Sequence, residues 1–124
     1  MPSVTSQLAW PAVLAAAVLA VGLAFVATGG ALAEPRLFEL TLTDGRLPES
    51  QRLLRVRQGD EVTLKWTTDR PFTLHLHGYD LEATLVPQTA VEVRFTARAT
   101  GRFPLEIHGP GTERTVGHLE VHPR

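Results

Sequence analysis

The chain has 124 residues, which allows one domain of ordinary size together with a short additional segment. Twelve Lys and Arg residues against thirteen Asp and Glu residues give a formal net charge of −1, and the charges are well mixed, which excludes a basic surface for nucleic acid or anionic lipid. Cysteine is absent, which excludes disulfides and every chemistry that needs a thiolate.

An uncharged stretch precedes all the charged residues. It runs from Leu8 to Ala33, and residues 8–27 are almost wholly apolar, close to the ~20 residues that cross a bilayer. Ala31 and Ala33 form the small-x-small pattern of a signal-peptidase site, although the first seven residues lack the Lys or Arg typical of a signal peptide. We therefore expect residues 1–33 to be a hydrophobic helix, either a signal peptide or a membrane anchor with cleavage preferred, and residues 34–124 to be exported to the periplasm or another extracytoplasmic space.

The exported part is patterned for strands. Apolar and polar residues alternate in short runs that Gly, Pro and Asp interrupt about every ten residues. Leu74 and Leu76 are the expected inward residues of one such run. The runs are residues 38–43, 54–57, 62–66, 72–77, 91–96, 103–108 and 116–122, and the short run 81–86 adds another. This pattern predicts an all-β Greek-key sandwich or barrel of about eight strands.

Three stretches resemble segments of the cupredoxin family. RVRQGDEVTLKWTTDRP is similar to the turn and strand that lead to the first copper ligand in that family. FTARATGRFPLEI resembles the run that ends at the copper cysteine, and TVGHLEV resembles the closing strand. The order and spacing agree over most of residues 37–122. The resemblance implies a cupredoxin-like domain over residues 34–124.

The same resemblance implies that no type 1 copper site is present. Carried over position by position, the copper cysteine falls at Ile107, the second histidine near Pro110, the axial methionine near Thr115 and the first histidine near Phe72. The chain has no Cys, and its single Met is Met1. Because a blue site needs two His and a thiolate, we expect no blue-copper electron transfer.

Histidines are the remaining candidate ligands. His75 and His77 lie two residues apart, so on a strand they share one face about 6.5–7 Å apart. The segment HLHG also resembles the His-x-His-Gly segments of multicopper oxidases. His108 follows the position of the lost cysteine, and His118 lies beyond the next loop. Imidazoles suit copper, which we favour, and zinc as the alternative.

A plainer interpretation of the same residues stays open. If Leu74 and Leu76 face the core, His75 and His77 lie on the outer face, where a histidine needs no special role. Asp80 and Glu82 then orient an imidazole or are simply exposed acids of the turn. The last histidine, His122, is expected to be frayed and without a role.

Two hypotheses follow. The first is a metal-binding module whose ligands are His75, His77, His108 and His118. The second is a metal-free structural or interaction module on a cupredoxin scaffold, docked to a membrane-associated protein. The sequence contains no Gly-x-Ser-x-Gly, phosphate-loop or His-Glu-x-x-His motif, so we expect no enzymatic activity, and we expect no nucleic-acid partner.

Overall fold

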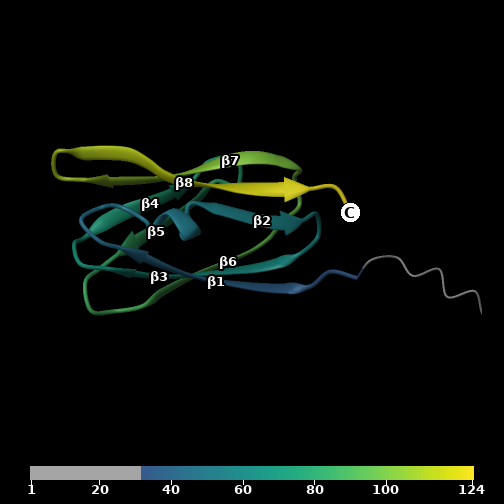
Figure 1. Ribbon diagram of the computed structural model, residues 1–124, viewed down its shortest axis with the longest axis horizontal. Helices are drawn as coiled ribbons and strands as arrows, with labels where there is room; N and C mark the ends of the chain where they lie inside the picture. The colour runs from purple at the N-terminus through teal and green to yellow at the C-terminus, as the bar shows by residue number, and fades with distance from the viewer. Residues whose placement is uncertain (1–31) are drawn as a thin grey trace, which may run out of the picture.

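The computed structural model describes residues 32–124, so the expected signal peptide or anchor lies almost entirely outside the described residues (Figure 1). The elements are β1 (Pro35–Leu42), a 3₁₀ turn η1 (Glu49–Gln51), β2 (Leu53–Arg57), β3 (Glu61–Thr68), β4 (Phe72–Leu76), β5 (Leu81–Leu85), β6 (Val91–Thr96), β7 (Gly101–Gly109) and β8 (Thr112–His122). Within residues 32–124, no helix has the length and apolar character needed to cross a membrane.

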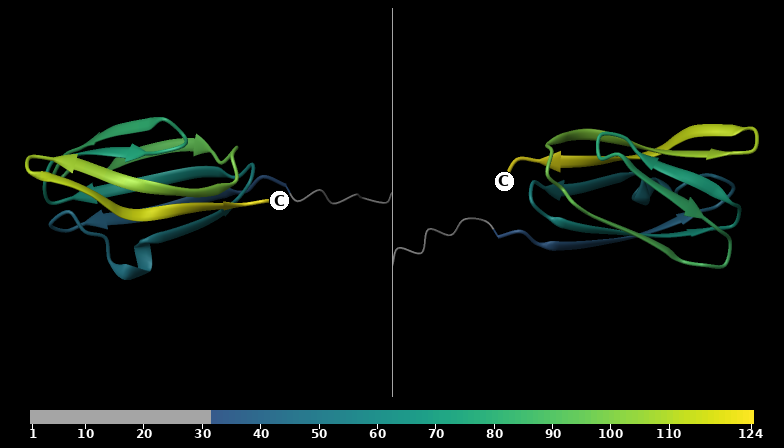
Figure 2. Two further views of the ribbon diagram at one scale, coloured as in Figure 1. Left: turned by 90° about the horizontal axis from the view of Figure 1, so that it is seen from above. Right: turned by 180° about the vertical axis from the view of Figure 1, so that it is seen from behind.

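The strands form two sheets packed as a sandwich. One sheet has the order β1-β3-β6 and the other the order β2-β8-β7-β4-β5. In Figure 1 the three-stranded sheet lies in the lower part of the view and β7 and β8 lie at the top, and Figure 2 shows the same layers from above and behind. The pairs β1/β3 and β2/β8 are parallel, and the remaining pairs are antiparallel. The predicted all-β sandwich of about eight strands is confirmed.

The core lies between the sheets and follows the alternation in the sequence. The three-stranded sheet contributes Leu64 and Trp66, which are fully buried, and the five-stranded sheet contributes Leu105, Ile107 and Leu119. Burying a side chain of this size stabilises the fold by about 2 kcal/mol relative to leaving it exposed. Because the apolar residues of each strand face inward, the intervening polar residues must face solvent.

The connection between β7 and β8 differs from the expectation of a loop followed by a strand at Val116. Strand β8 begins at Thr112, and Gly109 pairs with Thr112 across a tight turn. Gly111 has a φ of +70°, and Pro followed by Gly is the pair that a type II turn prefers. The two strands therefore form a long hairpin, the green and yellow ribbon at the upper left of Figure 1.

Candidate metal centre

The candidate ligands lie on the outer face of the five-stranded sheet. Strand β4 lies between β5 and β7. Leu74 and Leu76 of β4 are buried, so His75 between them faces outward, as the plainer interpretation of the sequence expected. The same alternation buries Ile107 of β7 and turns His108 to the outer face. Outer-face residues of neighbouring strands are thereby brought together.

The register decides which outer-face residues are neighbours. His75 pairs with Glu106 of β7 on one side and with Glu82 of β5 on the other. His108 pairs with Thr73 of β4 and, across the hairpin, with Glu113 of β8. Directly opposed side chains on an antiparallel pair lie about 4.5–5.5 Å apart at Cβ. Three histidines and three glutamates consequently occupy one area of the sheet.

The imidazole rings approach one another closely. The ring centroids of His75 and His108 are 4.6 Å apart, with an angle of 79° between the ring planes. The centroids of His75 and His77 are 6.2 Å apart, with an angle of 29°. Imidazole nitrogens bind a metal at about 2.0–2.1 Å, so rings that share an ion must be near neighbours of this kind. His75 therefore lies near both other rings, whereas the group whose ligand atoms all converge within 4.8 Å consists of Glu106, His108 and Glu113.

Carboxylates surround these rings. Nε2 of His77 donates a hydrogen bond to Oε2 of Glu106 at 2.8 Å, and the same oxygen lies 3.9 Å from Nε2 of His108. Nδ1 of His108 lies 3.7 Å from Oε1 of Glu113, and Nδ1 of His75 lies 3.7 Å from Oε2 of Glu82. Glu106, His108 and Glu113 offer ligand atoms within 4.8 Å of one another.

The cluster is partly shielded yet open to an ion from solvent. The side chains of His75, His108 and Glu106 are 33%, 34% and 26% exposed, whereas that of His77 is 54% exposed. A shallow pocket of about 250 Å³ adjoins His75 and His77. The site is therefore accessible without any opening of the fold.

The other two histidines lie elsewhere on β8. His118 pairs with Pro104 of β7 and with Leu53 of β2, and in the part of the chain that the structure describes no ring contact joins it to the cluster. Nε2 of His122 lies 3.2 Å from Oε2 of Glu120. The structure thus brings three of the four expected ligands together and places His118 apart from them.

Sequence reasoning did not single out Glu106 and Glu113. Glu106 lies two residues before His108, so period-2 alternation already assigns both to one face. Glu113 is opposed to His108 only because the Pro110–Gly111 turn makes a hairpin. The segment HGPGTE contained that signal, since Pro-Gly is a turn pair, but we expected a loop there.

The chain is similar to known proteins in three-dimensional structure and not in sequence. No protein-family model matches the chain, and no curated protein sequence matches it. A heme-copper terminal oxidase dimer structure matches with a TM-score of 0.58, 15% identity and coverage of 70% of this chain and 65% of that chain. The copper-containing nitrite reductase of Thermus scotoductus SA-01 matches with a TM-score of 0.58 and 18% identity, covering 73% of this chain and 28% of that chain.

A multi-copper oxidase from Pseudomonas thermotolerans is also similar, with a TM-score of 0.56 and 23% identity over 75% of this chain and 31% of that chain. The chain spans 65% or less of the length of each of these three structures. At such low identity the likeness concerns the fold. The described residues form a cupredoxin-like β-sandwich.

Proposed function

We propose that the chain is an exported cupredoxin-like domain that binds a metal ion through His75, His77 and His108, with copper favoured and zinc as the alternative. The observation that carries the proposal is the approach of His75 and His108 to 4.6 Å between ring centroids, although they come from different strands. Metal sites require this kind of convergence, and solvated surface histidines do not.

The orientation of the rings supports the same proposal. The Nδ1 atoms of His75 and His108 each lie 3.7 Å from a carboxylate oxygen, of Glu82 and Glu113 respectively, slightly beyond hydrogen-bonding distance. Metal-bound histidines usually present one nitrogen to a carboxylate and the other to the ion. Nε2 of each ring is then left for the metal. Glu106 lies between His77 and His108 and supplies an oxygen as a fourth ligand.

The donor set determines the chemistry of the proposed site. Imidazoles with one carboxylate suit Cu(II) and Zn(II), and copper binds more tightly in the first-row series. No cysteine is available to form the copper–thiolate bond of a blue site. We accordingly propose storage, delivery or sensing of the ion, by binding and without catalysis.

The proposal is tested by titrating Cu(II) into the purified chain and recording electron spin resonance spectra. We expect one saturable site with nitrogen hyperfine structure. His75→Ala and His108→Ala each remove a direct ligand and should weaken binding by roughly tenfold or more, since even outer partners of a metal site contribute about 10–100-fold. Zn(II), which binds such a donor set less tightly than Cu(II), should compete for the same site.

His122→Ala is the matched control, because this histidine is exposed and its contact with Glu120 lies outside the cluster. It should leave the affinity unchanged. His118→Ala should also have no effect if three histidines suffice, and a loss of affinity would restore His118 to the ligand set. Copper binding that survives both His75→Ala and His108→Ala would contradict the proposal and favour the metal-free interaction module.

Export is a separate part of the proposal. We propose that residues 1–33 direct the domain across a membrane, and that a retained anchor would hold it beside a membrane-associated protein partner. The support is the uncharged stretch from Leu8 to Ala33. Fractionation of cells that express the chain should recover the domain outside the cytoplasm, and its recovery in the cytoplasm would overturn this part alone.

A further inference from the structure

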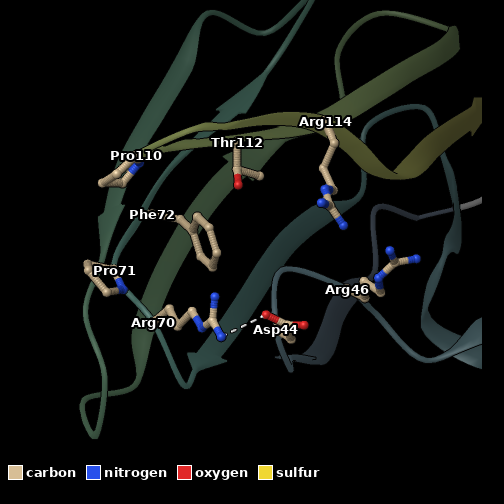
Figure 3. A pocket seen from close by; sticks show the side chains of 8 residues that line it. All are labelled: Asp44, Arg46, Arg70, Pro71, Phe72, Pro110, Thr112 and Arg114. Carbon is tan, nitrogen blue, oxygen red and sulfur yellow. Dashed lines mark ion pairs between the residues drawn. The ribbon is translucent and has the colours of Figure 1, made fainter.

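A pocket of about 420 Å³ opens at the end of the sandwich that carries the β7–β8 turn. Its walls come from the turn after β1, the connection from β3 to β4, and the hairpin itself, and Figure 3 shows the side chains that line it. Strand β8 alternates, so Glu113 belongs to the outer face and Arg114 to the opposite one. The pocket and the histidine cluster therefore lie on opposite faces of one hairpin.

The lining of the pocket is cationic. It contains Arg46, Arg70 and Arg114 against the single acid Asp44, a net charge of +2 from three positive groups and one negative group. The guanidinium of Arg70 pairs with Asp44 at 3.0 Å, drawn as the dashed line in Figure 3. Among residues 32–124, no carboxylate lies within ion-pairing distance of Arg46 or Arg114.

Arg46 and Arg114 also line a second, adjoining pocket of about 240 Å³, together with Arg52. They therefore stand between two hollows and not on a flat surface. The ε-nitrogen of Arg52 is already engaged, since it donates to the carbonyl of Leu47 at 3.0 Å. Arg46 and Arg114 are thus the two arginines that line both pockets and have no ion-pair partner among residues 32–124.

The floor of the first pocket is an aromatic ring held in a fixed position. Phe72 is 8% exposed, and its ring is packed between two glycines. A Cβ atom on Gly109 would lie 2.8 Å from Cδ1 of Phe72, and one on Gly45 would lie 3.2 Å from Cζ. No side chain can stand at either glycine without moving the ring. The ring therefore offers a small apolar surface to the pocket that the arginines also line.

We propose that this pocket binds a small organic anion, with a carboxylate held by Arg46 and Arg114 and an apolar body against Phe72. Guanidinium groups recognise carboxylates through two parallel hydrogen bonds. The volume falls within the range of small-molecule sites, which combine apolar walls with a few polar groups. The proposal uses none of the histidines and is independent of the metal centre.

The test follows binding of benzoate to the full chain by nitrogen–proton NMR, including the Nε–Hε signals of arginine. Benzoate should shift the Arg46 and Arg114 signals saturably. Arg46→Gln combined with Arg114→Gln should weaken binding by about tenfold or more, because each charged hydrogen bond contributes strongly. Both side chains are at least partly exposed, so the double variant should keep its melting temperature.

Arg94→Gln combined with Arg98→Gln is the matched control, since it removes the same two charges from exposed positions away from this pocket. It should leave benzoate binding unchanged. Neutral benzamide should not bind saturably, and inorganic phosphate should bind more weakly than benzoate. Equal losses in the two double variants, equal binding of benzamide or phosphate, or no saturable binding of benzoate would each overturn the proposal.

Discussion

Asp60 is the buried charged residue of the domain. Its side chain is fully enclosed, and it accepts hydrogen bonds from the backbone N–H groups of Arg57 at 2.9 Å and Glu34 at 3.1 Å. The guanidinium of Arg36 donates to it at 3.4 Å, and that of Arg124 forms an ion pair with it. One carboxylate thus connects the beginning of β1, the turn before β3 and the end of the chain.

These contacts determine how Asp60 titrates. Burial raises its pKa, but the hydrogen bonds from Arg57, Glu34 and Arg36 and the charge of Arg124 outweigh burial and lower the pKa below its usual value of 3.8. The unfolded chain therefore binds the proton more readily than the folded chain. The stability contributed by this group is present above the ordinary pKa and is lost as pH falls through the folded pKa.

Asp60→Asn should consequently destabilise the domain and flatten its acid dependence. We expect a loss of about 1–3 kcal/mol at neutral pH, typical of weakening hydrogen bonds to a buried charged group whose cationic partners are partly exposed. We also expect a smaller decline in stability as pH falls through and below the ordinary pKa of 3.8, because one linked proton is removed. Urea unfolding at several pH values measures both effects.

Asp80→Asn is the control, since Asp80 is an exposed turn acid and asparagine tolerates its φ of +52°. It should leave both stability and its acid dependence unchanged. An Asp60→Asn variant with the same acid dependence as the unmodified chain would show that the buried carboxylate does not carry this linkage.

At the residue scale, the sequence predicts which face of a strand a side chain occupies better than it predicts which residues of other strands lie beside it. Alternation placed Leu74 and Leu76 inside and His75 outside, and the structure agrees. Alternation is a local property, so it cannot tell which strand lies beside β4. The approach of His108 to His75 depends on the antiparallel register of β4 with β7, which pairs residues 29 to 35 positions apart. His75 and His108 can therefore both lie on the outer face of the sheet and still be close neighbours.

At the scale of elements, all eight strands were predicted, and the largest error in a boundary lies at the start of β8. The alternation in each run reflects burial of one face against the other sheet, which is why the strands could be recognised locally. Strand β8 starts at Thr112 and not at Val116, because Pro110 and Gly111 make a turn short enough for pairing to continue to the tip of the hairpin. No local pattern in the sequence indicates that β1 pairs in parallel with β3.

Gly117 of β8 shows how closely two strands can approach. A Cβ atom there would lie 2.7 Å from the backbone carbonyl oxygen of Arg52. That oxygen accepts the N–H of His118 at 2.8 Å at the start of the β2–β8 pairing. The backbone carbonyl of Arg52 cannot move away as easily as the end of a flexible side chain. The glycine is therefore required by the packing of these two strands.

Gly117→Ala should destabilise the domain by about 1–3 kcal/mol, the usual cost of forcing an extra carbon into a packed site. Thr115→Ala, at an exposed position of the same strand, should change stability by less than about 0.5 kcal/mol. Thermal unfolding followed by circular dichroism measures both. Equal stability of the Gly117→Ala variant and the unmodified chain would contradict the close approach of β2 and β8.

At the scale of the molecule, a cupredoxin-like sandwich carries two separate candidate sites around one hairpin. The histidine cluster uses the outer face of the five-stranded sheet, whereas the arginine pocket uses the end of the sandwich beside Phe72 and Pro110. In the resemblance to the cupredoxin family, the two positions expected for copper-binding histidines fall near these last residues. The fold can thus keep its core while the ligand-bearing positions change, because the core residues and the outer residues alternate along the same strands.

The most direct measurement for the metal centre is anomalous diffraction from crystals of the chain grown with Cu(II), recorded at the copper absorption edge. We expect one strong peak that lies about 2 Å from the ring nitrogens of His75, His77 and His108, with a carboxylate oxygen of Glu106 close by. A fully occupied copper peak bound only by His118 or His122, or crystals with no ordered copper at a saturating concentration, would contradict it.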